Sequence, residues 1–257
     1  MSVQLNFEVY GVGKPVIILH GLFGSARNWR SMAKSLANSY TVFTIDLRNH
    51  GESAHANSMY YIEMMEDLKQ FVQDQGIDKF SLLGHSLGGK VAMTFALTYQ
   101  EMLDKVIILD IAPVRYQNNF RQLIDAMLAL DLSRIKSRHE ANDFLKPEIE
   151  EPDMRLFLLQ NLYRDSNGFQ WRINLSAISL SLADIGAFPT FMKSTQYLDP
   201  VLFLDGDKSD YILPEYHKDI YAFFPTAKIS TINNANHWLH ADQPERVLEE
   251  IVQFLDA

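Results

Sequence analysis

Strand-like and helix-like patterns alternate along most of this 257-residue sequence, and no other feature constrains its fold as strongly. Short runs rich in β-branched and apolar residues are typical of buried strands, and they occur at residues 16–19, 41–47, 80–83, 106–111, 201–204 and 228–232. Between them, apolar residues at helical spacing predict helices at residues 29–37, 61–75, 90–99, 216–224 and 244–255. This alternation predicts an α/β protein with a mostly parallel sheet and helices on both faces. Residues 4–10 alternate apolar and polar side chains, which predicts an antiparallel strand at an exposed edge.

The alternation stops between residues 113 and 198. This stretch predicts consecutive helices at residues 120–130, 138–144, 153–163 and 175–185, with one strand-like run at 169–173. We therefore assign residues 1–112 and 199–257 to the core and residues 113–198 to a helical insertion. Because parallel sheets bind ligands at their carboxyl edge, where such an insertion leaves the core, we expect a helical cap over a pocket. The alternative is a helical excursion with no part in binding.

The composition excludes several classes of protein. Apolar residues make up 47% and charged residues 21%, as in ordinary globular proteins. A formal net charge of -9 disfavours a nucleic-acid partner, because phosphate binding needs positive charge. The absence of cysteine excludes disulfides, thiol nucleophiles and thiolate metal sites. The first residues do not resemble a secretory leader and no apolar run approaches the roughly 18 residues of a membrane span, so we expect a soluble, cytoplasmic protein.

The segment Gly-His-Ser-Leu-Gly at residues 84–88 lies directly between a predicted strand and a predicted helix. A serine on such a tight turn has a strained backbone, and side chains two residues away on either side would collide, which explains Gly84 and Gly88. This context is typical of a nucleophile elbow with Ser86 as the nucleophile. The turn also places the Leu87 N–H at a helix N-terminus, where it can donate to an oxyanion. The alternative is an ordinary glycine turn.

A serine hydroxyl needs a base to remove its proton, so the elbow predicts a histidine near the C-terminus and an acid between the two in sequence. His237 lies in a loop after the last predicted strand and before the last predicted helix, and we predict that it is the base. His240 follows three residues later, which raises the alternative of a metal site. Because the sequence places no third ligand, we interpret His240 as structural and expect no metal.

Three aspartates satisfy the order serine, acid, histidine: Asp110, Asp207 and Asp210. Asp207 and Asp210 lie in a turn-like segment after the strand at 201–204, where a solvated turn is the simpler interpretation. Asp110 lies within the apolar run at 106–111, where a carboxylate without a partner is costly. The cost of burial favours Asp110 and leaves Asp210 as the alternative.

Two other loops follow predicted strands. In His-Gly-Leu-Phe-Gly at residues 20–24 the glycines permit a tight loop, and the Leu22 N–H is a candidate second oxyanion donor. An ordinary strand-to-helix turn is the alternative. The polar residues 46–53 we interpret as scaffolding held by charge pairing.

These segments, taken in order, resemble the α/β-hydrolase superfamily over nearly the whole chain. The resemblance includes residues 20–25, the loop at 46–53, the elbow at Ser86 and the segment Asn-His-Trp at 236–238. Asn49 departs from the family, which usually has glycine at that position. Serine at the elbow argues against dehalogenase and epoxide-hydrolase relatives, whose nucleophile is an aspartate.

The segment Leu-Asp-Ile-Ala-Pro-Val at residues 109–114 resembles the bacterial YbfF-type esterases, a capped subgroup. In that subgroup the acid lies at the position matching Asp110. The wider family often has its acid in a Gly-x-x-Asp loop after a later strand, but here the third residue after Gly206 is Ser209, and Asp210 comes one place late. The resemblance therefore implies Asp110 as the acid, with Asp210 as the alternative.

Together these features predict a serine hydrolase that cleaves carboxylic esters, or thioesters, through an acyl-enzyme on Ser86. His237 acts as the base, Asp110 orients it, and the Leu22 and Leu87 amides bind the oxyanion. We expect a small-molecule acyl ester as substrate and no cofactor. The alternatives are a carbon–carbon bond hydrolase or a cofactor-free perhydrolase with the same three residues, or a ligand-binding homologue without activity.

Overall fold

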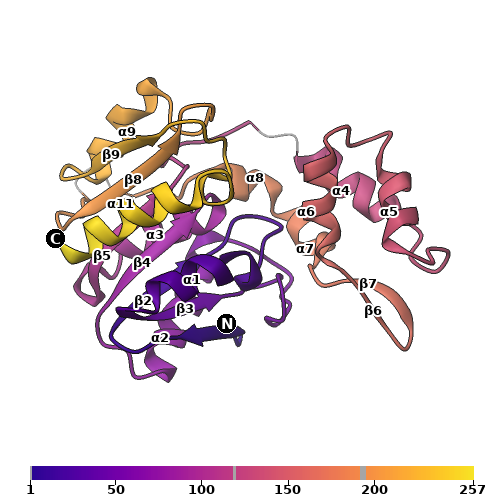
Figure 1. Ribbon diagram of the computed structural model, residues 1–257, viewed down its shortest axis with the longest axis horizontal. Coiled ribbons are helices and arrows are strands. Elements are labelled where there is room, and N and C mark those ends of the chain that lie inside the picture. Colours follow the sequence, from indigo (N-terminus) through magenta and orange to yellow (C-terminus); the bar gives the residue numbers. More distant parts are fainter. Residues whose placement is uncertain (1, 118–119, 192–194) are drawn as a thin grey trace.

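A seven-stranded sheet forms the centre of the structure (Figure 1). The computed structural model describes residues 2–117, 120–191 and 195–257. The strands, in spatial order, are β1 (Phe7–Tyr10), β3 (Tyr40–Ile45), β2 (Lys14–Leu19), β4 (Phe80–His85), β5 (Leu103–Leu109), β8 (Val201–Gly206) and β9 (Lys228–Ile232). β1 pairs antiparallel with β3 at the edge, and all other neighbours in this sheet are parallel. The predicted mostly parallel sheet is confirmed.

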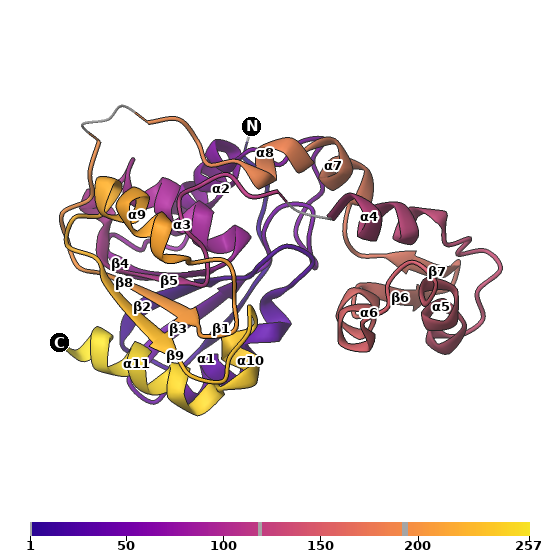
Figure 2. The same cartoon turned by 90° about the horizontal axis from the view of Figure 1, so that it is seen from above.

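Helices cover both faces of this sheet (Figure 2). On one face lie α2 (Tyr61–Asp74), α3 (Leu87–Ala96) and α9 (His217–Phe223), and on the other lie α1 (Arg30–Leu36), α10 (Leu239–Asp242) and α11 (Pro244–Asp256). Successive side chains of a strand point to opposite faces, so Ile17 and Leu19 pack in the core under α2 and α3, whereas Val16 and Ile18 pack under α1 and α11. Within the ranges described above, no helix combines the length and the apolar character needed to cross a bilayer.

The α3 helix begins three residues earlier than its pattern predicts. It starts at Leu87, directly after Ser86, whereas the apolar spacing indicated a start at residue 90. The sequence pattern does not indicate this first turn, because it contains Gly88 and Gly89, and glycine is a poor helix former that adds nothing to the apolar pattern. The chain therefore passes from β4 through Ser86 into α3 without a connecting loop.

The chain between β5 and β8 forms a group of short elements. These are α4 (Phe120–Ala129), α5 (Arg138–Leu145), α6 (Pro152–Leu159), β6 (Leu162–Asp165), β7 (Gly168–Trp171), α7 (Leu175–Leu180) and α8 (Leu182–Gly186). In both views α4 to α7 and the β6–β7 hairpin lie together to one side of the main sheet (Figures 1 and 2). Residues 118–119 and 192–194 of the predicted insertion lie outside the described residues.

Two predictions in this region are wrong in part. The helix predicted at 153–163 ends at Leu159, and the following residues form β6, paired antiparallel with β7. The two-residue turn at 166–167 explains this hairpin, because the Asn167 N–H donates to Asp165 Oδ1 at 2.7 Å and Gly168, opposite Asp165 at the start of β7, has a φ of 114°. The helix predicted at 175–185 is interrupted at Ser181, whose hydroxyl accepts a hydrogen bond from the Met59 N–H.

Candidate active site

Ser86 lies on the turn that joins β4 to α3. Its backbone has φ 52° and ψ -116°, a conformation that few residues other than glycine adopt. A Cβ at Gly84 would lie 2.2 Å from the Gly88 carbonyl oxygen, and a Cβ at Gly88 would lie 2.5 Å from the Leu19 carbonyl oxygen. Both positions therefore need glycine, because a side chain at either one would push α3 away from the sheet.

The structure brings Ser86, His237 and Asp110 together at the carboxyl edge of the sheet. Ser86 follows β4, Asp110 follows β5, and His237 lies between β9 and α10. The His237 Nδ1–H donates to Asp110 Oδ2 at 2.7 Å. This bond leaves the lone pair of Nε2 to accept the Ser86 hydroxyl, 3.0 Å away. The imidazole is thus held in the tautomer that can remove the serine proton.

Asp110 is fully buried, and its carboxylate is satisfied by partners from the loop after β8. The Gly206 N–H donates to Oδ1 at 3.3 Å, and the Ser209 hydroxyl donates to Oδ2, which also binds His237. Asp210 is exposed at the surface. Ser209 was not singled out as a functional residue from sequence, because nothing in the chain pattern indicates that this turn folds back against Asp110.

Aromatic rings surround the candidate base. The Tyr211 ring stacks on His237 with centroids 3.8 Å apart and an interplanar angle of 18°. His85 Nε2 lies 2.8 Å from the His237 carbonyl oxygen, which fixes the loop that carries the base. The His240 ring stacks on Trp29 at 4.3 Å. Burial lowers the pKa of His240 to about 4 and that of His85 well below its usual value, so both rings stay neutral beside His237.

The loop after β2 turns the Leu22 amide away from the groups that bind the Gly21 carbonyl. The Gly21 carbonyl accepts hydrogen bonds from His20 Nδ1 at 2.7 Å and from the Gly24 N–H at 3.0 Å. In a trans peptide the carbonyl and the N–H point in opposite directions, so these two bonds aim the Leu22 N–H the other way. His20 keeps its proton on Nδ1 because its Nε2 accepts the Leu47 N–H at 3.0 Å.

The next amide in this loop has a different partner. The Phe23 N–H donates to His50 Nε2 at 3.2 Å, so it is engaged by the loop at 46–53. Leu22 and Leu87 both line a small cavity with Ser86, and Leu87 is the first residue of α3. The two predicted oxyanion donors therefore both lie beside Ser86 at this cavity.

Two cavities meet at Ser86. One of about 90 Å³ is lined by His237 and Trp238, and by Phe120, Met154 and Phe157 from α4 and α6. It shares two residues of the loop after β2 with an open groove of about 510 Å³. The other cavity, of about 20 Å³, lies on the side of Leu22 and Leu87. Ser86 thus lies between a smaller and a larger cavity, and the larger one adjoins the groove at Phe23 and Asn28.

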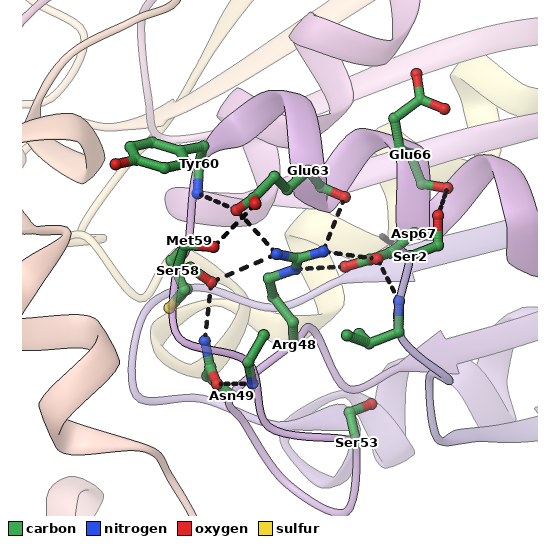
Figure 3. A network of polar contacts seen from close by, with 12 residues as sticks. Ser2, Arg48, Asn49, Ser53, Ser58, Met59, Tyr60, Glu63, Glu66 and Asp67 are labelled. Carbon is green, nitrogen blue, oxygen red and sulfur yellow. Dashed lines mark hydrogen bonds and ion pairs between the residues drawn. The ribbon is translucent and has the colours of Figure 1, made fainter.

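The loop at 46–53 is attached to α2 through Arg48 (Figure 3). The buried guanidinium lies 2.6 Å from Asp67 Oδ2 and 2.8 Å from Glu63 Oε2. Asn49 has a φ of 65°, a conformation that asparagine tolerates better than most residues, and its side-chain amide donates to the Ser58 carbonyl at 3.2 Å. The charge pairing expected in this loop is present, and it supports the turn that carries Leu22.

The comparisons with known proteins agree with this architecture. A family model described as "alpha/beta hydrolase fold" matches residues 14–244. The chain is 40% identical to the sn-1-specific diacylglycerol lipase ABHD11 of Danio rerio, over 98% of this chain and 83% of the relative. It is 32% identical to Esterase YbfF of Escherichia coli K12, over 94% and 93%. A solved structure described as a marine microorganism esterase superposes with a TM-score of 0.96 at 38% identity, covering 98% of this chain and all of that one. The chain belongs to the α/β-hydrolase fold family.

Proposed function

We propose that this protein is a carboxylesterase-type hydrolase that uses Ser86, His237 and Asp110 as its catalytic triad. The observation that carries the proposal is the continuous chain of hydrogen bonds from the serine hydroxyl through the imidazole to a fully buried carboxylate. Relatives that share 32–40% of their residues with this chain are named as a lipase or an esterase, which supports the same class of reaction.

In the first half-reaction Ser86 Oγ attacks the carbonyl carbon of the ester while His237 Nε2 takes the hydroxyl proton. The Leu22 and Leu87 N–H groups donate to the oxygen that becomes negative, and Asp110 stabilises the imidazolium. The intermediate collapses, the proton moves from His237 to the leaving alcohol oxygen, and the acyl group stays on Ser86. Water then attacks this acyl-enzyme with His237 again as the base, which releases the acid.

We also propose that residues 113–198 act as a cap over this site. Phe120, Met154 and Phe157 come from this segment and line the wider cavity next to His237. Their apolar side chains exclude water from one side of the scissile bond, which strengthens the electrostatic interactions that stabilise the oxyanion.

The test is active-site labelling combined with ester hydrolysis. We expect a fluorophosphonate to modify Ser86, and p-nitrophenyl acetate to give a burst of nitrophenolate followed by slower turnover, with an acetyl group on the Ser86 peptide in quenched samples. Ser86→Ala should lose labelling and at least about 10⁴-fold in kcat.

The same protein assayed with an acyl thioester, a β-diketone and a peroxide-dependent halogenation separates the alternative reactions. Hydrolysis of the thioester extends the proposal to that class. Turnover of only the diketone or only the peroxide substrate overturns the esterase assignment, and folded protein without labelling or turnover indicates a ligand-binding homologue.

A further inference from the structure

Lys90 is a buried cation in α3, one helical turn after Ser86. Its side chain is 2% exposed. Its ammonium group lies 2.9 Å from the Val114 carbonyl, 3.1 Å from the Gly186 carbonyl and 2.6 Å from the Ala187 carbonyl. An ammonium has three N–H donors, so these carbonyls use all of them and none is left for a substrate.

The three carbonyls belong to the two ends of the segment between β5 and β8. Val114 lies where the chain leaves the sheet, and Gly186 and Ala187 lie at the end of α8, where it returns. The Tyr116 N–H also donates to the Gly186 carbonyl at 2.8 Å, and the Tyr116 ring lies under the Lys90 ammonium at 4.8 Å. Lys90 therefore ties both ends of this segment to the helix of the nucleophile.

The same residues enclose the smaller cavity beside Ser86. Lys90, Tyr116 and Gly186 line it together with Leu22 and Leu87, and its volume is about 20 Å³. A water molecule needs roughly 10–15 Å³ on this scale, so the cavity accommodates only a group of a few atoms. Its width depends on how closely the two chain ends are held to α3.

The position of His237 indicates which part of an ester enters this cavity. The leaving alcohol must lie next to His237, because this residue protonates it. His237 lines the wider cavity, which shares Phe23 and Asn28 with the groove, whereas Leu87 lines only the smaller cavity and Leu22 lines both. The acyl group consequently points into the smaller cavity, and the alcohol part has room to extend.

We propose that Lys90 is a positioning residue that keeps the acyl cavity narrow and thereby restricts the substrates to esters of short acyl groups such as acetate. This inference rests on the proposed function. Burial, and to a smaller extent the charge of Arg115, lower the pKa of Lys90 to about 7. Burying a lysine side chain costs free energy, and a structural role at this position would explain why the chain has a lysine there.

The test compares kcat/KM for p-nitrophenyl acetate and p-nitrophenyl octanoate in the wild type, Lys90→Met and Lys105→Met. Lys105 is a matched control, because its ammonium also binds two backbone carbonyls, those of Phe254 and Leu255 at 2.9 Å, far from the site. We expect the wild type to prefer acetate at least tenfold. Lys90→Met should reduce this preference at least tenfold, with most of the change in KM for acetate, and Lys105→Met should leave it within twofold.

Chemical rescue separates the ammonium from general packing. The chain has no cysteine, so Lys90→Cys introduces a unique thiol. Alkylation of that thiol with 2-bromoethylamine in urea, followed by refolding, restores a lysine-like side chain and should restore the preference for acetate. Circular dichroism establishes that each variant is folded.

The outcomes distinguish the two proposals. A wild type that hydrolyses esters but prefers octanoate overturns this inference, whether or not any variant folds. An unchanged preference for acetate over octanoate in folded Lys90→Met also overturns the inference. If the wild type shows neither turnover nor labelling of Ser86, the proposed function itself fails.

Discussion

Asp110 combines two unusual properties for an aspartate. It has a φ of 51° and it is fully buried, yet its carboxylate accepts hydrogen bonds from His237, Ser209 and the Gly206 amide. These donors stabilise the charged form and offset the cost of removing it from water. The loop after β8 supplies a hydroxyl, that of Ser209, which donates to a carboxylate at the end of the neighbouring strand.

Exchange of one carboxylate at a time tests this assignment. Asp110→Asn should lower kcat for p-nitrophenyl acetate by about 10⁴-fold, because the amide no longer holds His237 in the tautomer that accepts the serine proton. Asp210→Asn, at an exposed position, should stay within twofold of the wild type. Near-normal turnover in Asp110→Asn together with a large loss in Asp210→Asn would show that the other carboxylate is the acid.

Much of the site was predictable from sequence because its chemistry depends on local patterns. The turn around Ser86 and the loop around His237 each have a recognisable context, and the cost of burying Asp110 indicated a partner. Ser209 and Tyr211 were not predictable in the same way, because their contacts with the site join loops distant in sequence and leave no local pattern.

At the scale of elements, the junction of β4 and α3 determines how the nucleophile is presented. The close approach of Gly84 to the Gly88 carbonyl leaves no room for a methyl group. A strand that passes directly into a helix thus depends on two glycines rather than on a loop.

Gly84→Ala should lower the free energy of unfolding by about 3 kcal/mol and reduce turnover, because α3 must shift away from the sheet. Gly76→Ala is the control, since Gly76 has a φ of 65° but nothing within 4 Å of the added Cβ, and it should cost only about 1 kcal/mol of backbone strain. Urea unfolding of both variants checks this. A loss in Gly84→Ala no larger than that in Gly76→Ala would show that a small shift relieves the close contact, since Gly84 has no positive φ.

The strands of the main sheet were predictable because each is a short apolar run with a clear end. The helices between β5 and β8 were harder, since the apolar spacing of residues 153–163 continues past Leu159 into the hairpin strand β6. The Asn167–Gly168 dipeptide was the available signal for that hairpin, because such a pair favours a tight turn between two strands.

At the scale of the whole molecule, four histidines around the site are neutral rings: His20, His50 and His85 are buried, and His240 is partly buried with its Nδ1 shielded from solvent. Burial lowers the pKa of His50 to about 3 and that of His240 to about 4. The unfolded chain binds protons at these positions near pH 6.5, whereas the folded protein does not. These neutral histidines therefore do not lower the free energy of unfolding above about pH 6.5, and they lower it progressively as the pH falls below that value.

We expect the free energy of unfolding to decrease between pH 6.5 and pH 4, with His50 and His240 each contributing a loss of about 2 kcal/mol at pH 5. His240→Phe should remove the contribution of one histidine and make the free energy of unfolding depend less steeply on pH. The exchange breaks no hydrogen bond at Nδ1 of His240, because this buried atom has no partner in the described part of the chain. Urea denaturation at a series of pH values measures both curves. Parallel curves for the two proteins would show that His240 is protonated equally in the folded and unfolded states.

The strands β5 and β8 are direct neighbours, with Leu109 opposite Leu204, although the whole segment of α4 to α8 separates them in sequence. Val114, near the start of this segment, and Gly186 and Ala187, at the end of α8, all bind the Lys90 ammonium, so α4 to α8 leave and rejoin the core at one place beside α3. Exchanging the segment of α4 to α8 for one of another length would require no change in the order or register of the strands. Evolution can in this way alter which molecules reach the serine without rebuilding the apparatus that cleaves them.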